Sequence, residues 1–119
     1  MTVVRVLAFI APVAIAACAS PSPGERTAAS ELAALAPLKQ AYPSVVMGFD
    51  LRGDSTLIVS LDLQSYDEMD DDDATAMLRS AAERWKSAWL QAHPHGHAVL
   101  HVRFIDFIGR RIAERSLTV

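Results

Sequence analysis

The segment that decides the fold is a pair of alternating apolar stretches around one turn, and residues 45–63 read VVMGFDLRGDSTLIVSLDL. Side chains of a β-strand point alternately to opposite faces, so an apolar residue at every second position predicts a strand with one buried face. Gly53 and Asp54, between the two stretches, are typical of a tight turn, and we therefore predict a β-hairpin. Its predicted core face comprises Val45, Met47, Phe49, Leu51, Leu57, Val59, Leu61 and Leu63, and its outer face comprises Val46, Gly48, Asp50, Ile58, Ser60 and Asp62.

The strongest helical pattern of the chain follows this hairpin and ends near Ala92, before Pro94 and Gly96. The acidic run 70–73 precedes the pattern, and acidic side chains are favourable at the positive end of a helix dipole. Steps of three and four residues place the apolar side chains on one face of the predicted helix. These residues are Ala74, Met77, Leu78, Ala81, Ala82, Trp85, Ala88, Trp89 and Ala92.

A second alternating stretch follows the helical pattern and predicts another strand. Its core side would carry Ala98, Leu100, Val102 and Phe104, and its outer side Val99, His101, Arg103 and Ile105. A turn near residues 108–110 leads to a final strand at about 111–117. The order ββαββ predicts an α+β fold with two layers: a mostly antiparallel four-stranded sheet, with the long helix and a short N-terminal helix on one face.

Length and composition indicate one small folded domain. The chain has 119 residues, of which 51% are hydrophobic and 21% charged, which is typical of a globular chain rather than a disordered one. Its 14 acidic residues outnumber its 11 basic ones, so we expect no nucleic-acid partner. Cys18 is the one cysteine, which excludes an intramolecular disulfide.

The N-terminus has the features of a leader. Arg5 precedes an apolar run over residues 6–19, which is shorter than the roughly 20 residues of a transmembrane helix and has the length of a signal-peptide core. The run ends in Ile15-Ala16-Ala17-Cys18, which resembles the lipobox of bacterial lipoproteins. Beyond this motif we recognise no domain family.

The resemblance implies that residues 1–17 are a lipoprotein signal peptide cleaved before Cys18. It further implies that Cys18 carries a thioether-linked diacylglyceryl group and that its new amino terminus is acylated, with chains such as palmitate. Ala19, where an aspartate would favour the inner membrane, implies an outer-membrane anchor facing the periplasm of a bacterial cell envelope. The alternative is an ordinary secreted protein, because Ala17 and Ala19 also fit a small-x-small cleavage site.

A tether and a short helix are predicted after the lipobox. Residues 18–29 are rich in Pro, Ser and Gly and have no apolar period, so we expect a tether there and a single α+β domain over 30–119. Ser30 is a candidate N-cap for a first helix. That helix would carry Leu32, Leu35 and Leu38, and Pro37 would make it short, kinked or split.

All four histidines lie within nine residues, which is one possible functional site. Alternate positions His93, His95 and His97 could share a metal ion such as Zn²⁺ or Cu²⁺. The alternative is structural: His93 caps carbonyl groups at the helix end while Pro94 and Gly96 break the helix. We expect at most weak metal binding by this loop, and we expect no obligatory cofactor.

Catalysis is not indicated by any motif, since the chain has no nucleophile elbow, phosphate-binding loop or dinucleotide fingerprint. The best catalytic constellation would be Asp50, Asp62, His101 and Arg103 on the outer sheet face. Cross-strand charge pairing explains these four residues equally well. We therefore predict that the protein is not an enzyme.

The outer sheet face is also more apolar than a solvated face requires, because Val46, Ile58, Val99 and Ile105 are predicted to lie on it. Such a mixed surface can dock an envelope protein or a second copy of the chain. Our leading interpretation is a lipid-anchored cell-envelope interaction or assembly module. The alternative is a metal-binding envelope lipoprotein that uses the loop His93–His97.

Overall fold

The computed structural model describes Ser20 and residues 22–119. Its α+β fold confirms the predicted class. The helices are α2 (Pro23–Ala33), α3 (Ala36–Ala41), α4 (Leu63–Asp67) and α5 (Asp71–Ala92). The strands are β1 (Val46–Arg52), β2 (Thr56–Leu61), β3 (Val99–Ile105) and β4 (Arg111–Thr118).

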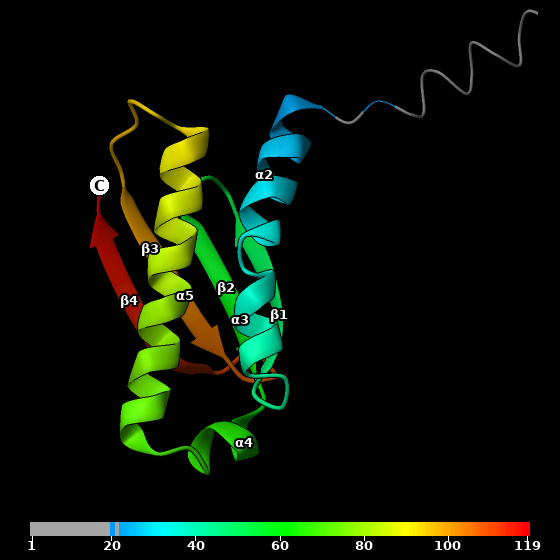
Figure 1. The fold of residues 1–119 in the computed structure, drawn as a ribbon, viewed down its shortest axis with the longest axis vertical. Helices are drawn as coiled ribbons and strands as arrows, with labels where there is room; N and C mark the ends of the chain where they lie inside the picture. The colour runs from blue at the N-terminus through cyan, green and yellow to red at the C-terminus, as the bar shows by residue number, and fades with distance from the viewer. Residues whose placement is uncertain (1–19, 21) are drawn as a thin grey trace, which may run out of the picture.

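The four strands form one mixed sheet in the order β1-β2-β3-β4 (Figure 1). The β1–β2 and β3–β4 pairs are antiparallel hairpins, and the central β2–β3 pair is parallel. The prediction of a mostly antiparallel ββαββ sheet is therefore wrong at its centre. The reason is the length of α5, whose 22 residues span about 33 Å. The helix thus returns the chain to the end of the sheet at which β2 began, and β3 runs in the same direction as β2.

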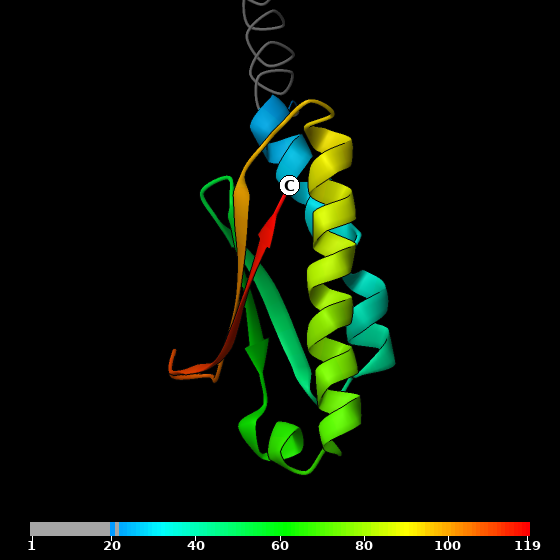
Figure 2. The ribbon, with the colours of Figure 1, turned by 90° about the vertical axis from the view of Figure 1, so that its left-hand side faces the viewer.

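Helices α2, α3 and α5 lie on the same side of the sheet in the view of Figure 2. Between the layers lies one core, in which Trp85 and Phe104 are the largest fully buried side chains. The predicted apolar face of α5 supplies six of its buried residues: Met77, Ala81, Ala82, Trp85, Ala88 and Trp89. The alternating positions of β2 and β3 are buried as predicted, namely Leu57, Val59, Leu61, Leu100, Val102 and Phe104.

The N-terminal helix begins earlier than predicted, so residues 23–29 belong to α2 and not to a tether. Ser22 is the N-cap, and its hydroxyl accepts a hydrogen bond from the backbone N–H of Glu25. The Glu25 side chain returns a bond to the Ser22 N–H, which completes a capping box, and Pro23 starts the helix. Serine and proline, read as tether composition, are here helix-start signals. Pro37 lies in the first turn of the separate helix α3, so the predicted split is confirmed.

The start of β1 departs from strict alternation. The register with β2 shifts between Val46 and Gly48, which marks a β-bulge, and an extra residue in one strand reverses the facing of its neighbours. Val46 is therefore only 1% exposed within the core, whereas Met47 is 56% exposed. The predicted facing of these two residues is wrong, although Phe49 and Leu51 pack against the core as expected.

No helix within Ser20 and residues 22–119 combines the length and the apolar character that crossing a lipid bilayer requires.

Candidate functional site

The outer sheet face is less apolar than the sequence predicts. Val46 does not lie on it, Ile58 and Ile105 are only partly exposed, and Val99 is exposed at the far end of β3. The register places Ile58 between Asp50 of β1 and Arg103 of β3. The four proposed docking residues therefore do not form one continuous apolar patch.

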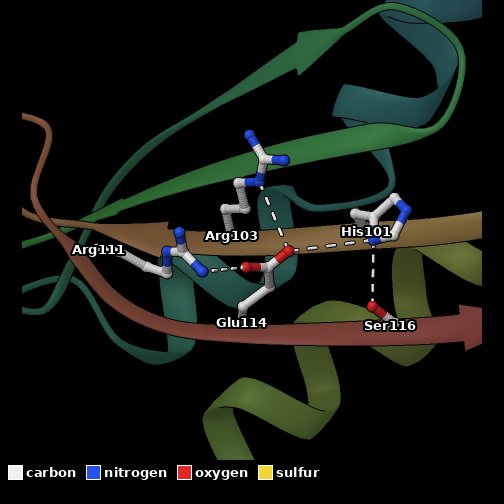
Figure 3. Close-up of polar contacts among 5 residues, drawn as sticks. All are labelled: His101, Arg103, Arg111, Glu114 and Ser116. Carbon is white, nitrogen blue, oxygen red and sulfur yellow. Dashed lines mark hydrogen bonds and ion pairs between the residues drawn. The ribbon is translucent and has the colours of Figure 1, made fainter.

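Charged side chains occupy the β3–β4 half of this face (Figure 3). Glu114 accepts a hydrogen bond from Arg111 Nη1 at 2.7 Å, and its other oxygen lies 3.6 Å from Arg103 Nε. That oxygen is also 4.0 Å from His101 Nδ1, which is hydrogen-bonded to Ser116 Oγ at 3.1 Å. Opposite charges on neighbouring strands stabilise a sheet, so this cluster has a structural explanation.

The four residues considered as a catalytic group, Asp50, Asp62, His101 and Arg103, do not form one site. Asp50 pairs with Arg52 at 2.7 Å on the exposed β1–β2 hairpin. Asp62 is the N-cap of α4, where it accepts hydrogen bonds from the Ser65 hydroxyl at 2.7 Å and the Ser65 N–H at 3.0 Å. These bonds, the hydroxyl first, lower the pKa of Asp62 against a small opposing effect of burial. Each carboxylate thus has a local partner.

The histidines of the loop after α5 do not converge. His93 is the C-cap of α5; its Nδ1–H donates to the carbonyl of Trp89 at 2.9 Å, and its ring stacks on the indole at 4.3 Å. The structural role predicted for His93 is confirmed. His95 and His97 are exposed and line a shallow groove together with Lys86, whose charge repels metal cations. Among the described residues, no three His, Cys, Asp or Glu side chains are close enough to hold a metal ion.

The turn between β3 and β4 is held by a buried carboxylate that accepts three hydrogen bonds. Asp106 at its base is only 2% exposed. Its Oδ1 accepts from the backbone N–H groups of Ile108 at 3.1 Å and Arg110 at 2.8 Å, and its Oδ2 accepts from Arg110 Nε at 2.9 Å. Burial raises the pKa of Asp106, but the bonds and charge of Arg110 and the N–H of Ile108 outweigh it and hold the pKa below its usual value.

This carboxylate fixes a turn that presents two large apolar side chains to solvent. Phe107 is 87% exposed and Ile108 is 59% exposed. Gly109 closes the turn at φ +87°, a left-handed conformation that favours glycine, and its N–H donates to the Asp106 carbonyl. We call residues 106–110 the apolar turn. Figure 2 shows this turn projecting sideways from the sheet, on the side away from the helices.

A groove runs between the apolar turn and α4. It encloses about 600 Å³ and is lined on one side by Phe107. On the other side it is lined by Leu63, Gln64 and Asp67 of α4 and by the two capping residues of this helix, Asp62 and Glu68. Three of the six lining side chains are acidic. The groove therefore combines an aromatic wall with negative charge.

Comparison with protein-family models, with curated proteins and with solved structures finds no match for this chain.

The predicted turn near residues 108–110 is present, but the apolar side chains at its tip were not singled out from the sequence as a functional feature. Asp106 at the start, Gly109 and the flanking strands predict a turn, but a turn normally carries polar residues. Phe107 and Ile108 at its tip break that rule. Cys18, the predicted lipidation site, lies outside the described residues.

Proposed function

We propose that the chain is a lipid-anchored docking module of the bacterial cell envelope, without catalytic activity, which binds a partner protein through its apolar turn. The single observation that supports this function most is the exposure of Phe107 and Ile108 on a turn held by a buried carboxylate. The lipid anchor rests on the lipobox that ends at Cys18.

An exposed aromatic side chain on a fixed turn favours binding of a partner. A large apolar side chain in water forgoes the stabilisation that burial would provide, about 25 cal/mol for each Å². A turn whose backbone is already held in place by Asp106 also loses little backbone conformational entropy when a partner covers it. Aromatic anchors of this kind often dominate the energy of protein interfaces.

In this proposal the helices cover one face of the sheet. The partner contacts the opposite, outer face at the end of β3 that leads into the apolar turn. Ile105, in the strand that leads into the turn, and Ile58 on the neighbouring strand extend the contact. Val99 lies at the opposite end of β3 and is not part of it. The start of α2 lies at the far end of the molecule from the turn (Figures 1 and 2), so a chain anchored at Cys18 would present the turn away from the lipid.

The test is a comparison of two surface variants of the full lipidated chain. We would cross-link membranes that contain the parent chain, a Phe107→Ser/Ile108→Ser double variant, or a Val99→Ser control, and identify the co-purified proteins. The double variant should melt like the parent, because neither side chain is buried, and should lose a partner that the parent and the control retain. A folded double variant that keeps every parental partner would contradict the proposal.

A further inference from the structure

Residues of α2, the β1–β2 turn and the C-cap of α5 line a small cavity. Figure 2 shows these segments in the upper part of the molecule. The cavity encloses about 300 Å³, at the lower limit of typical small-molecule sites. One face of α2 lines it with Thr27, Ala28 and Glu31, while Leu51, Asp54 and His93 contribute the opposite walls. The cavity is remote from the apolar turn.

Glu31 is the unusual member of this lining, because its side chain ends in a carboxyl group and yet is only 6% exposed. Its Oε1 accepts a hydrogen bond from Trp85 Nε1 at 2.8 Å. In the described part of the chain the carboxylate forms no ion pair, and its Oε2 has no hydrogen-bond donor. The same part contains no fully buried polar side-chain atom without a partner, so Oε2 must retain some contact with solvent. The cavity that Glu31 lines provides that contact.

The residues and the helix end around Glu31 contribute negative rather than positive charge. Asp54 is a second acidic residue of the lining, and no lysine or arginine belongs to the described lining of the cavity. His93 is the C-cap of the 22-residue helix α5, whose C-terminal end carries the negative end of the helix dipole. The Nδ1 of His93 is already bonded to the Trp89 carbonyl and directs no proton toward the cavity. A buried carboxylate without a cation is energetically unfavourable, and a bound cation would relieve this cost.

We infer that this cavity binds a small organic ammonium ion, with the nitrogen against Glu31 and a short alkyl chain against Ala28 and Leu51. A metal ion fits less well, since the described residues contain no cluster of three ligating side chains. The apolar walls instead suit the alkyl part of an amine. This ligand site is independent of the proposed docking function and can fail or succeed without it.

Each tryptophan of the chain donates a hydrogen bond to a residue that lines the cavity. Trp85 donates to Glu31, and Trp89 donates to the Asp54 carbonyl at 2.8 Å and stacks on His93. We would titrate the purified full chain, in a non-ionic detergent, with n-butylammonium chloride at constant ionic strength and record tryptophan fluorescence. Neutral n-butanol is the matched probe of equal length. The inference expects a saturable change with n-butylammonium and at least tenfold weaker binding of n-butanol.

Variants that each remove one acidic side chain then test whether n-butylammonium binds in this cavity. Glu31→Gln keeps an oxygen that can accept the Trp85 hydrogen bond and should weaken n-butylammonium binding at least tenfold. Asp54→Asn, at an exposed position whose backbone carbonyl still accepts from Trp89, should weaken it by a smaller factor. Glu83→Gln, which removes an exposed acid elsewhere on α5, should change nothing. Equal responses to both probes, no saturation, or unchanged binding in Glu31→Gln and Asp54→Asn would each overturn the inference.

Discussion

Glu31 of α2 accepts a hydrogen bond of 2.8 Å from the indole nitrogen of Trp85, which lies 54 residues later on α5. The bond joins the N-terminal helix to the centre of the core, and both partners are buried. It gives the Trp85 N–H the partner that a buried indole usually requires. Helix α2 packs against both α5 and β1.

We expect Trp85→Ala to cost about 3–5 kcal/mol of unfolding free energy, because it opens a large cavity and leaves Glu31 without its donor. This loss is comparable to the whole stability of a small domain. Chemical denaturation followed by circular dichroism measures it. Lys86→Ala, the neighbouring position on the same helix, is the control and should change stability little. Parental stability of Trp85→Ala would contradict the described core.

Gly96 packs against the stacked side chains of His93 and Trp89 at the end of α5. A Cβ added at Gly96 would lie 2.8 Å from Trp89 Cη2 and 2.9 Å from His93 Cβ. We therefore predict that Gly96→Ala destabilises the domain by about 1–3 kcal/mol through overpacking. Gly48→Ala is the matched control, since its added Cβ would meet no atom within 4 Å. Equal melting temperatures for the two variants would rule out this packing.

The apolar turn should lose its order in acid. The pKa of Asp106 is held below its usual value by Arg110 and Ile108, so its ionised form stabilises the folded state. That contribution is complete above about pH 4, the ordinary pKa of an aspartate, and is lost as the pH falls through the lowered folded value.

Asp106→Asn tests this dependence. The variant should melt at a lower temperature than the parent at pH 7, and the difference should shrink as the pH is lowered below about 4. Asp50→Asn, which removes an exposed carboxylate paired with Arg52, should show a smaller effect at neutral pH. A difference for Asp106→Asn that stayed constant between pH 7 and pH 3 would refute the assigned role.

Zinc should bind the loop after α5 no more tightly than micromolar, because His93 is committed to Trp89 and only His95 and His97 are free to turn toward an ion. Isothermal titration calorimetry of the full chain measures the affinity. A His95→Ala/His97→Ala variant serves as the reference. A stoichiometric nanomolar site that disappears in this variant would restore the metal-binding interpretation.

Cys18→Ser should accumulate as unprocessed precursor and take up no labelled fatty acid, since the chain has no other thiol. Metabolic labelling followed by electrophoresis distinguishes precursor from mature protein. Normal acylation of this variant would contradict the lipobox interpretation, whereas cleavage without acylation of the parent chain would support ordinary secretion.

The sequence pattern predicted those parts of the fold that depend on local periodicity. Alternation identified the buried side of β2 and β3, and steps of three and four identified the buried face of α5. These patterns succeed because every residue of a regular element follows the same geometry.

The features of the fold and of the candidate sites that were not predicted depend on tertiary contacts or local irregularities, which the periodicity of the sequence does not indicate. One extra residue at the start of β1 exchanged the facing of Val46 and Met47. The parallel direction of β3 depends on where a 22-residue helix ends relative to the sheet. For the candidate sites, the burial of Asp106 and Glu31 arises from tertiary packing, and acidic residues in a sequence are otherwise expected at the surface.

The parallel β2–β3 pairing has a consequence for the order of folding. It joins Thr56 to His101, residues separated by 45 positions (101 − 56), whereas each hairpin joins near neighbours in the chain. Contacts between distant residues require closure of a long loop and slow the search for the native state. Either hairpin can therefore form early, but the sheet is complete only when α5 has folded back across it. A growing chain that still lacks residues 99–105 has no partner for the inner edge of β2, so the sheet cannot be completed before β3 has been synthesised.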